Sequence, residues 1–310
     1  MYRIWTDEPI LESVRPMLEG MAHLIGPGAP IEELATCEAA LDPGAQWNAA
    51  RMDRAPRLRV LSRIGVGYDN IDVKAATERG IMVCYTPHGP TQSTAEHTVG
   101  LIFAAAKTIA YADRDIRAGR WHTKVTTLKG MELKGRTLGL VGAGRIGCQV
   151  AQIMQAVGMN VIAFDPVLTP DRATQLNLRK IEQLEDLLAQ SDVVSLHAPS
   201  NPETRHLINA TRLNAMKRGA ILINTARGAL IDEHSLANAL QSGHLAAAGL
   251  DVFEREPMNI DNPLRNLENV VLTDHIASHT WAGHHRLYEM AVHHVLQALR
   301  GEKPDQLLNG

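Results

Sequence analysis

The sequence predicts an α/β protein with two doubly wound parallel sheets. Short apolar runs alternate with amphipathic stretches from end to end, as in folds whose helices cover a parallel sheet. The chain has 310 residues, which is enough for two domains. No repeat or low-complexity segment interrupts the alternation.

The first third of the chain predicts one small α/β domain. We expect strands over residues 3–6, 22–26, 57–64 and 81–84, and helices near 9–19 and 72–79. The turn-rich loop 86–92 follows, and Ser93 and Glu96 then offer capping residues for a helix start. We expect one long helix over 94–118.

The rest of the chain repeats the rhythm of strand and helix. Strands are expected over 138–141, 160–164, 192–197, 220–225, 246–252 and 269–273, and helices over 145–157, 181–190, 209–217, 232–241 and 283–300. No strand follows the last helix, so we expect it to pack back on the first domain. The predicted domains are therefore 1–93 with 284–310, and 94–283, with ligands bound in the cleft between them.

A glycine-rich turn, Gly142-x-Gly144-x-x-Gly147, lies between an expected strand and helix. The glycines permit a tight turn and close backbone approach, and the helix directs its first amides at a pyrophosphate. Asp165 ends the next strand, where a carboxylate can hold a ribose diol. The pattern predicts a Rossmann dinucleotide site, and Asp165 favours NAD because it repels a 2'-phosphate.

Polar side chains follow three later strands at the edge where a ligand is expected. Arg227, Glu256 and His275 occupy these strand ends. Arginine matches a carboxylate with a planar fork, and histidine exchanges a proton near neutral pH. A neighbouring glutamate favours the charged imidazole and fixes its tautomer. Together with a nicotinamide cofactor, these groups suit oxidation of a hydroxy acid.

Composition argues against several other classes of protein. A net charge of −3 and the lack of a basic stretch give no case for nucleic acid, and no segment is a membrane anchor or signal peptide. The three cysteines form no CxxC pair, and the 14 histidines show no metal-ligand spacing. We therefore expect a cytoplasmic protein with reduced cysteines and no metal.

Seven segments together resemble the D-isomer-specific 2-hydroxyacid dehydrogenase family, over nearly the whole chain. They are GVGYDNID (65–72), STAEHTVGL (93–101), VGAGRIG (141–147), LHAPSNPETRHLIN (196–209), NTARG (224–228), GLDVFEREP (249–257) and LTDHIASHT (272–280). The resemblance implies an NAD-dependent oxidoreductase with a Rossmann domain and a flavodoxin-like substrate domain. It also implies a homodimer formed through 94–118 and the following Gly119-Arg120-Trp121.

The resemblance implies roles for individual residues. Arg227 binds the substrate carboxylate, His275 is the acid/base and Glu256 is its partner. The implied substrate contacts also include Arg63, Ile64, Gly65, Val66 and Gly67. The implied cofactor contacts are Thr94, Gly142, Gly144, Arg145, Ile146, Gly147, Asp165, His197, Ala198, Pro199, Thr204, Thr225, Ala226, Asp251 and Ala277.

Some positions depart from the family pattern. Asp274 stands where proline usually precedes the histidine, and it either favours the charged form of His275 or binds another group. His279 and Trp281 replace small residues and either shape the substrate pocket or cover its rim.

The resemblance leaves the substrate open. The stretch 128–170, with Arg63, is similar to 3-phosphoglycerate dehydrogenases and favours an acid with an anionic tail, such as a phosphorylated or sulfonated one. His88 and Pro90 lie in a loop whose sequence differs from that of 3-phosphoglycerate dehydrogenases, so reduction of glyoxylate or hydroxypyruvate is a close rival. An NAD-sensing corepressor is the alternative of another class, and retention of Arg227, Glu256 and His275 favours an enzyme.

Overall fold

A computed structural model describes residues 1–121 and 130–310. The predicted phosphoglycerate-dehydrogenase-like stretch begins at residue 128, so its first two residues lie outside the described residues. The chain divides into two compact units, Met1–Thr91 with His279–Gly310, and Gln92–Ser278. The sequence-based division placed the boundaries after residues 93 and 283.

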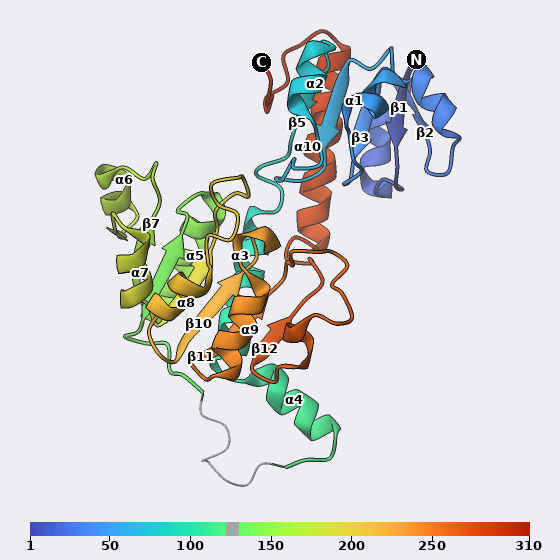
Figure 1. The fold of residues 1–310 in the computed structure, drawn as a ribbon. Helices are drawn as coiled ribbons and strands as arrows, with labels where there is room; N and C mark the ends of the chain where they lie inside the picture. Colours follow the sequence, from blue (N-terminus) through green and yellow to red (C-terminus); the bar gives the residue numbers. More distant parts are fainter. Residues whose placement is uncertain (122–129) are drawn as a thin grey trace. The chain divides into compact units, whose positions relative to one another are not determined.

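The first unit is a five-stranded parallel sheet with the order β2-β1-β3-β4-β5. Its strands are β1 (Tyr2–Thr6), β2 (Ala22–Ile25), β3 (Ala39–Asp42), β4 (Val60–Arg63) and β5 (Met82–Cys84). Its helical segments are η1 (Glu12–Leu18), η2 (Ile31–Thr36), α1 (Ala49–Asp53), α2 (Val73–Glu78) and α10 (Trp281–Leu299), which Figure 1 labels in part.

Two apolar layers enclose this sheet. On one face, α10 and η1 pack on the strands, and Ala291, Val292 and Val295 are fully buried. On the other face, η2, α1 and α2 cover the sheet around the buried Trp47. The residues of α10 that face the sheet recur at helical spacing, which explains why the C-terminal helix joins a sheet formed by the start of the chain.

The second unit is a seven-stranded parallel sheet with the order β12-β11-β10-β9-β6-β7-β8. Its strands are β6 (Thr137–Val141), β7 (Asn160–Phe164), β8 (Arg179–Lys180), β9 (Val193–Leu196), β10 (Ala220–Asn224), β11 (Leu245–Leu250) and β12 (Val270–Leu272). Its helical segments are α3 (Thr91–Ala106), α4 (Ile109–Arg117), α5 (Arg145–Val157), α6 (Pro170–Gln175), α7 (Leu184–Gln190), α8 (Ala210–Ala215), η3 (Gly228–Leu230), α9 (Glu233–Gln241) and η4 (Pro263–Asn266).

Helices cover both faces of the seven-stranded sheet. Apolar residues of α7, α8 and α9 form the core on one face, and those of α3, α5 and α6 form it on the other. The paired strands of this sheet run parallel, so the carboxyl ends of β6, β7 and β9 to β12 lie at one edge. The strand order reverses between β6 and β9, which is where such sheets bind ligands.

The predicted fold class is confirmed, with differences in individual elements. The segments 145–157 and 160–164 are the predicted helix and strand, whereas β3, β8, α1, α6, η2, η3 and η4 were not predicted. The prediction of one helix over 94–118 was wrong. The chain forms α3 and α4, separated at Thr108, whose φ of 54° is left-handed and interrupts the helix. Among the described residues, no helix is long and apolar enough to cross a membrane.

The buried His294 of α10 makes the stability of the first unit depend on pH. Burial lowers the pKa of His294 from 6.5 to about 4, and His293 adds to the effect while Asp305 opposes it. On acidification, His294 is therefore protonated at a higher pH in the unfolded chain than in the folded protein. The free energy of unfolding should fall by up to about 3 kcal/mol between pH 6.5 and 4. His294→Leu should remove this part of the pH dependence in urea denaturation; an unchanged slope contradicts the assignment.

Candidate active site

The glycine turn after β6 has a shape that requires glycine at two positions. Gly142 has a φ of 102°, and a Cβ there would lie 2.7 Å from the carbonyl oxygen of His197. A Cβ on Gly147 would lie 2.4 Å from the carbonyl oxygen of Gly142. A Cβ on Gly144 would meet nothing within 4 Å, so open space lies beside this residue.

The N-terminus of α5 is suited to an anion. Gly144 is its N-cap and supplies no side-chain hydrogen bond, and the first turn, which begins with Arg145 and Ile146, contains no acidic residue. The first backbone amides of a helix carry partial positive charge and bind phosphate groups. These features, with the open space at Gly144, fit the pyrophosphate of a dinucleotide.

Asp165 lies immediately after β7 and reaches back to the glycine turn. Its Oδ2 accepts a hydrogen bond from the Ala143 amide at 2.7 Å, and its Oδ1 accepts one from the Val167 amide at 2.9 Å. A carboxylate has further lone pairs for hydroxyl donors. The position and charge of Asp165 suit a ribose diol.

The segment after β9 lies beneath the glycine turn. The His197 ring is 3.0 Å from Ser195 Oγ, and burial lowers the pKa of His197 to about 4, which keeps the ring neutral at pH 7. Ala198 is half-buried, and Thr204 Oγ1 donates to the Pro199 carbonyl at 2.8 Å. The segment is thus held in shape by its own hydrogen bonds.

Side chains of α3 reach the end of β10. Thr98 Oγ1 donates to the Thr94 carbonyl at 2.7 Å and lies 2.7 Å from Thr225 Oγ1. The next residues, Ala226 and Arg227, form a turn in which Arg227 Nη1 donates to the Ala226 carbonyl at 2.6 Å. The structure therefore places Thr94, Thr225 and Arg227 around one strand end.

Glu256 and His275 form a direct hydrogen bond. Glu256 Oε2 lies 2.7 Å from His275 Nδ1, and Glu256 Oε1 accepts a hydrogen bond from the Phe253 amide at 3.0 Å. Burial alone would raise the pKa of Glu256, but the bonds from His275 and Phe253 and the charges of His275 and Arg227 hold it below its usual range. The ionised carboxylate fixes Nδ1 as the donor and leaves Nε2 for a reacting group.

Asp251 anchors the segment that carries His275. Its fully buried carboxylate accepts hydrogen bonds from the Ile276 amide at 3.0 Å and the Ala277 amide at 2.9 Å, and Thr273 Oγ1 donates to it at 2.6 Å. The His275 amide donates to the Asp251 carbonyl at 2.8 Å. His275 has a φ of 59°, a conformation that non-glycine residues hold only when their surroundings impose it.

The pKa of Asp251 reflects this set of donors. Burial raises it, but hydrogen bonds from His97, Thr273 and the amides of Ala277 and Ile276 outweigh burial and hold the pKa below its usual range. Asp251 was predicted as a cofactor contact, and in the structure both of its oxygens serve the loop 273–277.

Gly228 allows the Arg227 turn to lie against the segment that bears Glu256. A Cβ on Gly228 would lie 1.9 Å from the Phe253 carbonyl carbon and 2.4 Å from the Glu254 amide nitrogen. Any side chain here would push the Arg227 turn away from the segment of Glu256.

Two supporting residues, His97 and Thr98, were missed by the sequence analysis. His97 Nε2 lies 3.0 Å from Thr273 Oγ1 and 3.4 Å from Asp251 Oδ1, and Thr98 lies beside Thr225. His97 and Thr98 belong to the STAEHTVGL segment, in which only Thr94 was predicted to contact the cofactor. The spacing of Thr94 and Thr98 by four residues was the available signal, since it places them on one helix face.

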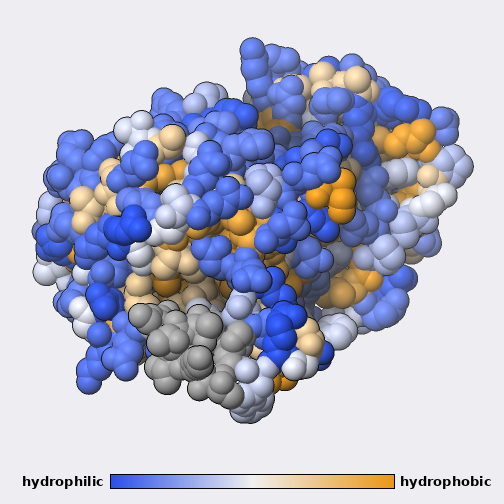
Figure 2. All heavy atoms as spheres, turned by 60° about the horizontal axis from the view of Figure 1, so that its bottom comes forward, coloured by the Kyte–Doolittle hydropathy of each residue, from blue (hydrophilic) through white to orange (hydrophobic). Residues whose placement is uncertain are grey.

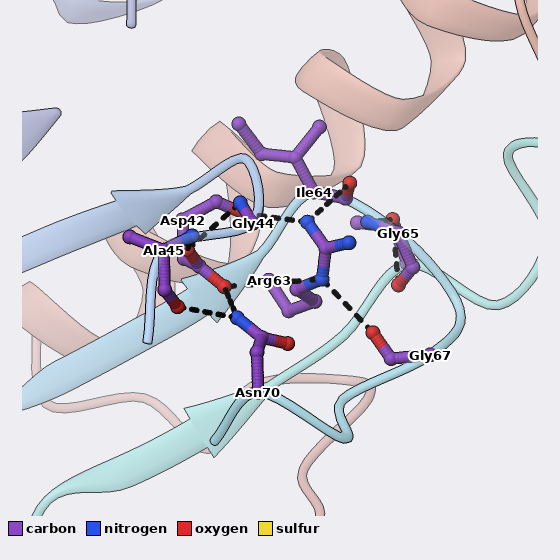
Figure 3. Close-up of polar contacts among 9 residues, drawn as sticks. Asp42, Gly44, Ala45, Arg63, Ile64, Gly65, Gly67 and Asn70 are labelled. Atoms are coloured by element: carbon purple, nitrogen blue, oxygen red, sulfur yellow. Dashed lines mark hydrogen bonds and ion pairs between the residues drawn. The ribbon is translucent and has the colours of Figure 1, made fainter. Parts of the chain in front are cut away.

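In the first unit, Arg63 supports the loop that follows β4 (Figure 3). Its guanidinium donates to the carbonyls of Gly67 at 2.9 Å, Asp42 at 3.1 Å and Ile64 at 3.1 Å. It also lies 3.8 Å from the buried Asp42 carboxylate. Burial raises the pKa of Asp42, while Arg63, Asn70 and the amides of Gly44 and Ala45 oppose the rise.

The backbone amides of the same loop fall into two groups. The Ile64 amide donates to the Asp42 carbonyl at 2.8 Å and the Gly65 amide donates to Thr86 Oγ1 at 2.8 Å. The amides of Val66 and Gly67 donate to no other described residue. Of the amides predicted for substrate, those of Ile64 and Gly65 therefore hold the loop together.

Comparisons with known proteins agree with this geometry. A family model described as the NAD binding domain of D-isomer specific 2-hydroxyacid dehydrogenases matches residues 99–277. A glyoxylate reductase of Korarchaeum cryptofilum is 43% identical over 285 residues, which are 90% of this chain and 85% of that protein. A D-3-phosphoglycerate dehydrogenase of Archaeoglobus fulgidus is 46% identical over 233 residues, which are 75% of this chain and 44% of that protein.

Solved structures are similar over nearly the full length. The TT0316 protein of Thermus thermophilus has a TM-score of 0.90 at 39% identity, with 99% of each chain covered. A D-lactate dehydrogenase of Aquifex aeolicus, complexed with NAD and lactic acid, has a TM-score of 0.87 at 29% identity, again with 99% of each chain covered. The chain belongs to the D-isomer specific 2-hydroxyacid dehydrogenases and is an NAD-dependent oxidoreductase.

Gly228→Ala tests the close approach of the Arg227 turn. We expect it to destabilise the protein by about 1–3 kcal/mol, as overpacking does, and to lower the melting temperature. Gly100→Ala is the matched control, because a Cβ at this position in α3 meets nothing within 4 Å and alanine favours a helix by about 1 kcal/mol. Equal melting temperatures for the two variants would contradict the packing described.

Proposed function

We propose that the chain reduces a short 2-keto acid to the D-2-hydroxy acid, with Arg227, Glu256 and His275 as its active-site residues. The 2.7 Å bond between Glu256 and His275 Nδ1 carries this proposal. It leaves Nε2 of a protonated His275 to donate to the carbonyl oxygen of the substrate. The bound nicotinamide cofactor supplies or accepts the hydride.

Each of the other residues has a defined task in this proposal. The Arg227 guanidinium orients the substrate carboxylate, and Glu256 stabilises the imidazolium before the proton leaves. In the reverse direction, neutral His275 takes the hydroxyl proton. The first amides of α5 would hold the cofactor pyrophosphate, and Asp165 its ribose diol.

We propose that the second unit is the NAD-binding domain and the first the substrate domain. The glycine turn supports the assignment of the second unit as the NAD-binding domain. The amides of Val66 and Gly67, which can bind a carboxylate, support the assignment of the first unit as the substrate domain. The other residues predicted around the cofactor, among them Thr94, His197 and Thr225, lie at strand ends of the second unit or on α3.

The placement of Arg63 favours a compact substrate of the glyoxylate or hydroxypyruvate class. An arginine that reads an anionic tail must present its fork to the ligand. The fork of Arg63 is directed at carbonyls of its own loop and at Asp42, and its side chain is 17% exposed. A 3-phosphoglycerate-like acid is the second candidate, supported by the similarity to phosphoglycerate dehydrogenases.

Reduction of glyoxylate with NADH tests the assignment of the active site. We expect His275→Ala to lower kcat by at least about 100-fold, in the range of acid–base contributions. Glu256→Gln should lower kcat, because His275 loses the carboxylate that fixes Nδ1 as the donor and orients the ring. NADH binding without turnover on a broad panel of acids would instead favour the corepressor.

A panel of keto acids with Arg63→Gln tests the substrate class. We expect kcat/KM to be at least about tenfold higher for glyoxylate or hydroxypyruvate than for the phosphorylated acid, which corresponds to about 1.4 kcal/mol. Arg63→Gln should lower kcat/KM by the same factor for all of them, since Arg63 supports the loop. A selective loss for the phosphorylated acid would show that Arg63 binds the tail.

We propose that the protein is a cytoplasmic homodimer and binds neither nucleic acid nor membranes. Support for a dimer comes from α4, in which only Asp115 is buried. Ile109, Ile116 and Trp121 are 53%, 54% and 76% exposed, and Ile109 and Ile116 are seven residues apart on one helix face. Figure 2 shows apolar patches interrupted by hydrophilic residues.

The free cysteines support a reducing compartment such as the cytoplasm. Recovery of the protein outside the cytoplasm in cell fractionation would contradict this location.

Light scattering after size exclusion tests the dimer. We expect a mass of twice 33.9 kDa at micromolar concentration, and a monomer for Ile116→Glu because a buried charge costs several kcal/mol. Ile260→Glu is the matched control, since Ile260 is also exposed but lies outside α4, in the turn before η4. A dimer that survives Ile116→Glu would remove α4 from the interface.

A further inference from the structure

His206 has a backbone conformation that glycine would adopt more easily. Its φ is 48°, and its amide donates to the Ala229 carbonyl at 2.8 Å, so the conformation is tied to the segment after Arg227. A bulky residue with positive φ is uncommon and is held there by its surroundings. The surroundings of His206 therefore impose this backbone conformation.

The His206 ring contacts the segment that bears Glu256. Its Nε2 lies 3.0 Å from Glu254 Oε2, with the side chains 36% and 27% exposed. Arg205 Nη2 is 3.8 Å from the same oxygen. The pair connects the segment after β9, which includes Pro199 and Thr204, to the segment after β11.

Glu254 has a second set of contacts at the start of α9. Its Oε1 accepts a hydrogen bond from the Glu233 amide at 3.2 Å, and its own amide donates to Glu233 Oε1 at 2.7 Å. Glu233 Oε2 in turn accepts from Asn262. Three segments that follow β9, β10 and β11 thus converge on the Glu254 side chain and its amide.

We propose that the His206–Glu254 pair positions Glu256 for its bond with His275. Glu254 is two residues before Glu256, and the amide of Phe253, the residue before Glu254, donates to Glu256 Oε1. Movement of the segment 253–254 is therefore transmitted to Glu256. His206 and Glu254 are positioning residues that act through Glu256, and this inference rests on the proposed role of Glu256.

His206→Gly tests the positioning role without straining the backbone. We expect kcat for glyoxylate reduction to fall about tenfold with KM changed less than about twofold, because a displaced Glu256 affects the chemical step more than binding. The melting temperature should stay the same or rise, since glycine adopts positive φ freely. His206→Asn, which also tolerates this conformation, replaces it if the glycine variant does not fold.

Asn177→Gly is the matched control. Asn177 has a φ of 52°, and its backbone accepts a hydrogen bond from Gln155 Nε2 at 2.8 Å and donates one to the Thr174 carbonyl at 3.0 Å. Glycine keeps both of these backbone groups and gains freedom at this φ. We expect wild-type kcat for this variant. A similar fall in kcat for Asn177→Gly and His206→Gly would show a general backbone effect and overturn the inference.

A double-mutant cycle separates the pair from two independent effects. His206→Gly with Glu254→Ala should be no slower than the worse single variant, because Glu254→Ala already removes the contact that His206→Gly removes. Glu254→Gln should recover most of the kcat lost in Glu254→Ala, since its amide oxygen still accepts one hydrogen bond. Multiplicative losses, or kcat of His206→Gly within twofold of wild type, overturn the inference. Wild-type protein without turnover, or an active His275→Ala variant, points instead to failure of the proposed function.

Discussion

The geometry of the active site depends on one buried carboxylate. Asp251 is fully buried at the end of β11, and its two oxygens accept hydrogen bonds from two successive amides after His275 and from Thr273. These bonds hold His275 in a left-handed conformation. That conformation brings Nδ1 to within 2.7 Å of Glu256. Without the hydrogen bonds to Asp251, the unfavourable backbone conformation of His275 would not be stabilised.

The parallel sheet places these residues on adjacent strands. β10, β11 and β12 are neighbours, and Arg227, Glu256 and His275 follow them in that order. Gly228 lets the turn after β10 touch the segment after β11. The same edge carries the glycine turn of β6 and the carboxylate of β7, so one edge of the sheet presents both the proposed cofactor residues and the proposed catalytic residues.

The strand, glycine turn and helix around residues 137–164 were predictable because local sequence largely determines them. Gly147 is required by its contact with Gly142, five residues earlier, and α5 and β7 have the predicted bounds. The contact of Gly142 with His197, after β9, is long-range. β3 was missed because its four residues, all fully buried, lack an alternating pattern. The break at Thr108 was missed because neither glycine nor proline marks it.

Long-range hydrogen bonds account for the other differences. The partners of Asp251 include His97, which lies 154 positions earlier in the chain, and no local pattern indicates this contact. The orientation of Arg63 depends on carbonyls that face it only after the loop has folded. Residue types therefore indicated the kind of chemistry, while the tertiary contacts determined which arginine supports a loop and which carboxylate anchors one.

The role of Asp251 can be tested most directly by nuclear magnetic resonance of the Asp251→Asn variant. Wild-type protein labelled uniformly with 15N should show a low-field proton signal for His275 Nδ1–H bonded to Glu256, and protected amides at Ile276 and Ala277. Asparagine has one acceptor oxygen in place of two, so the variant should lose the low-field signal and exchange these amides faster. A variant that keeps both the signal and the protection would contradict the account.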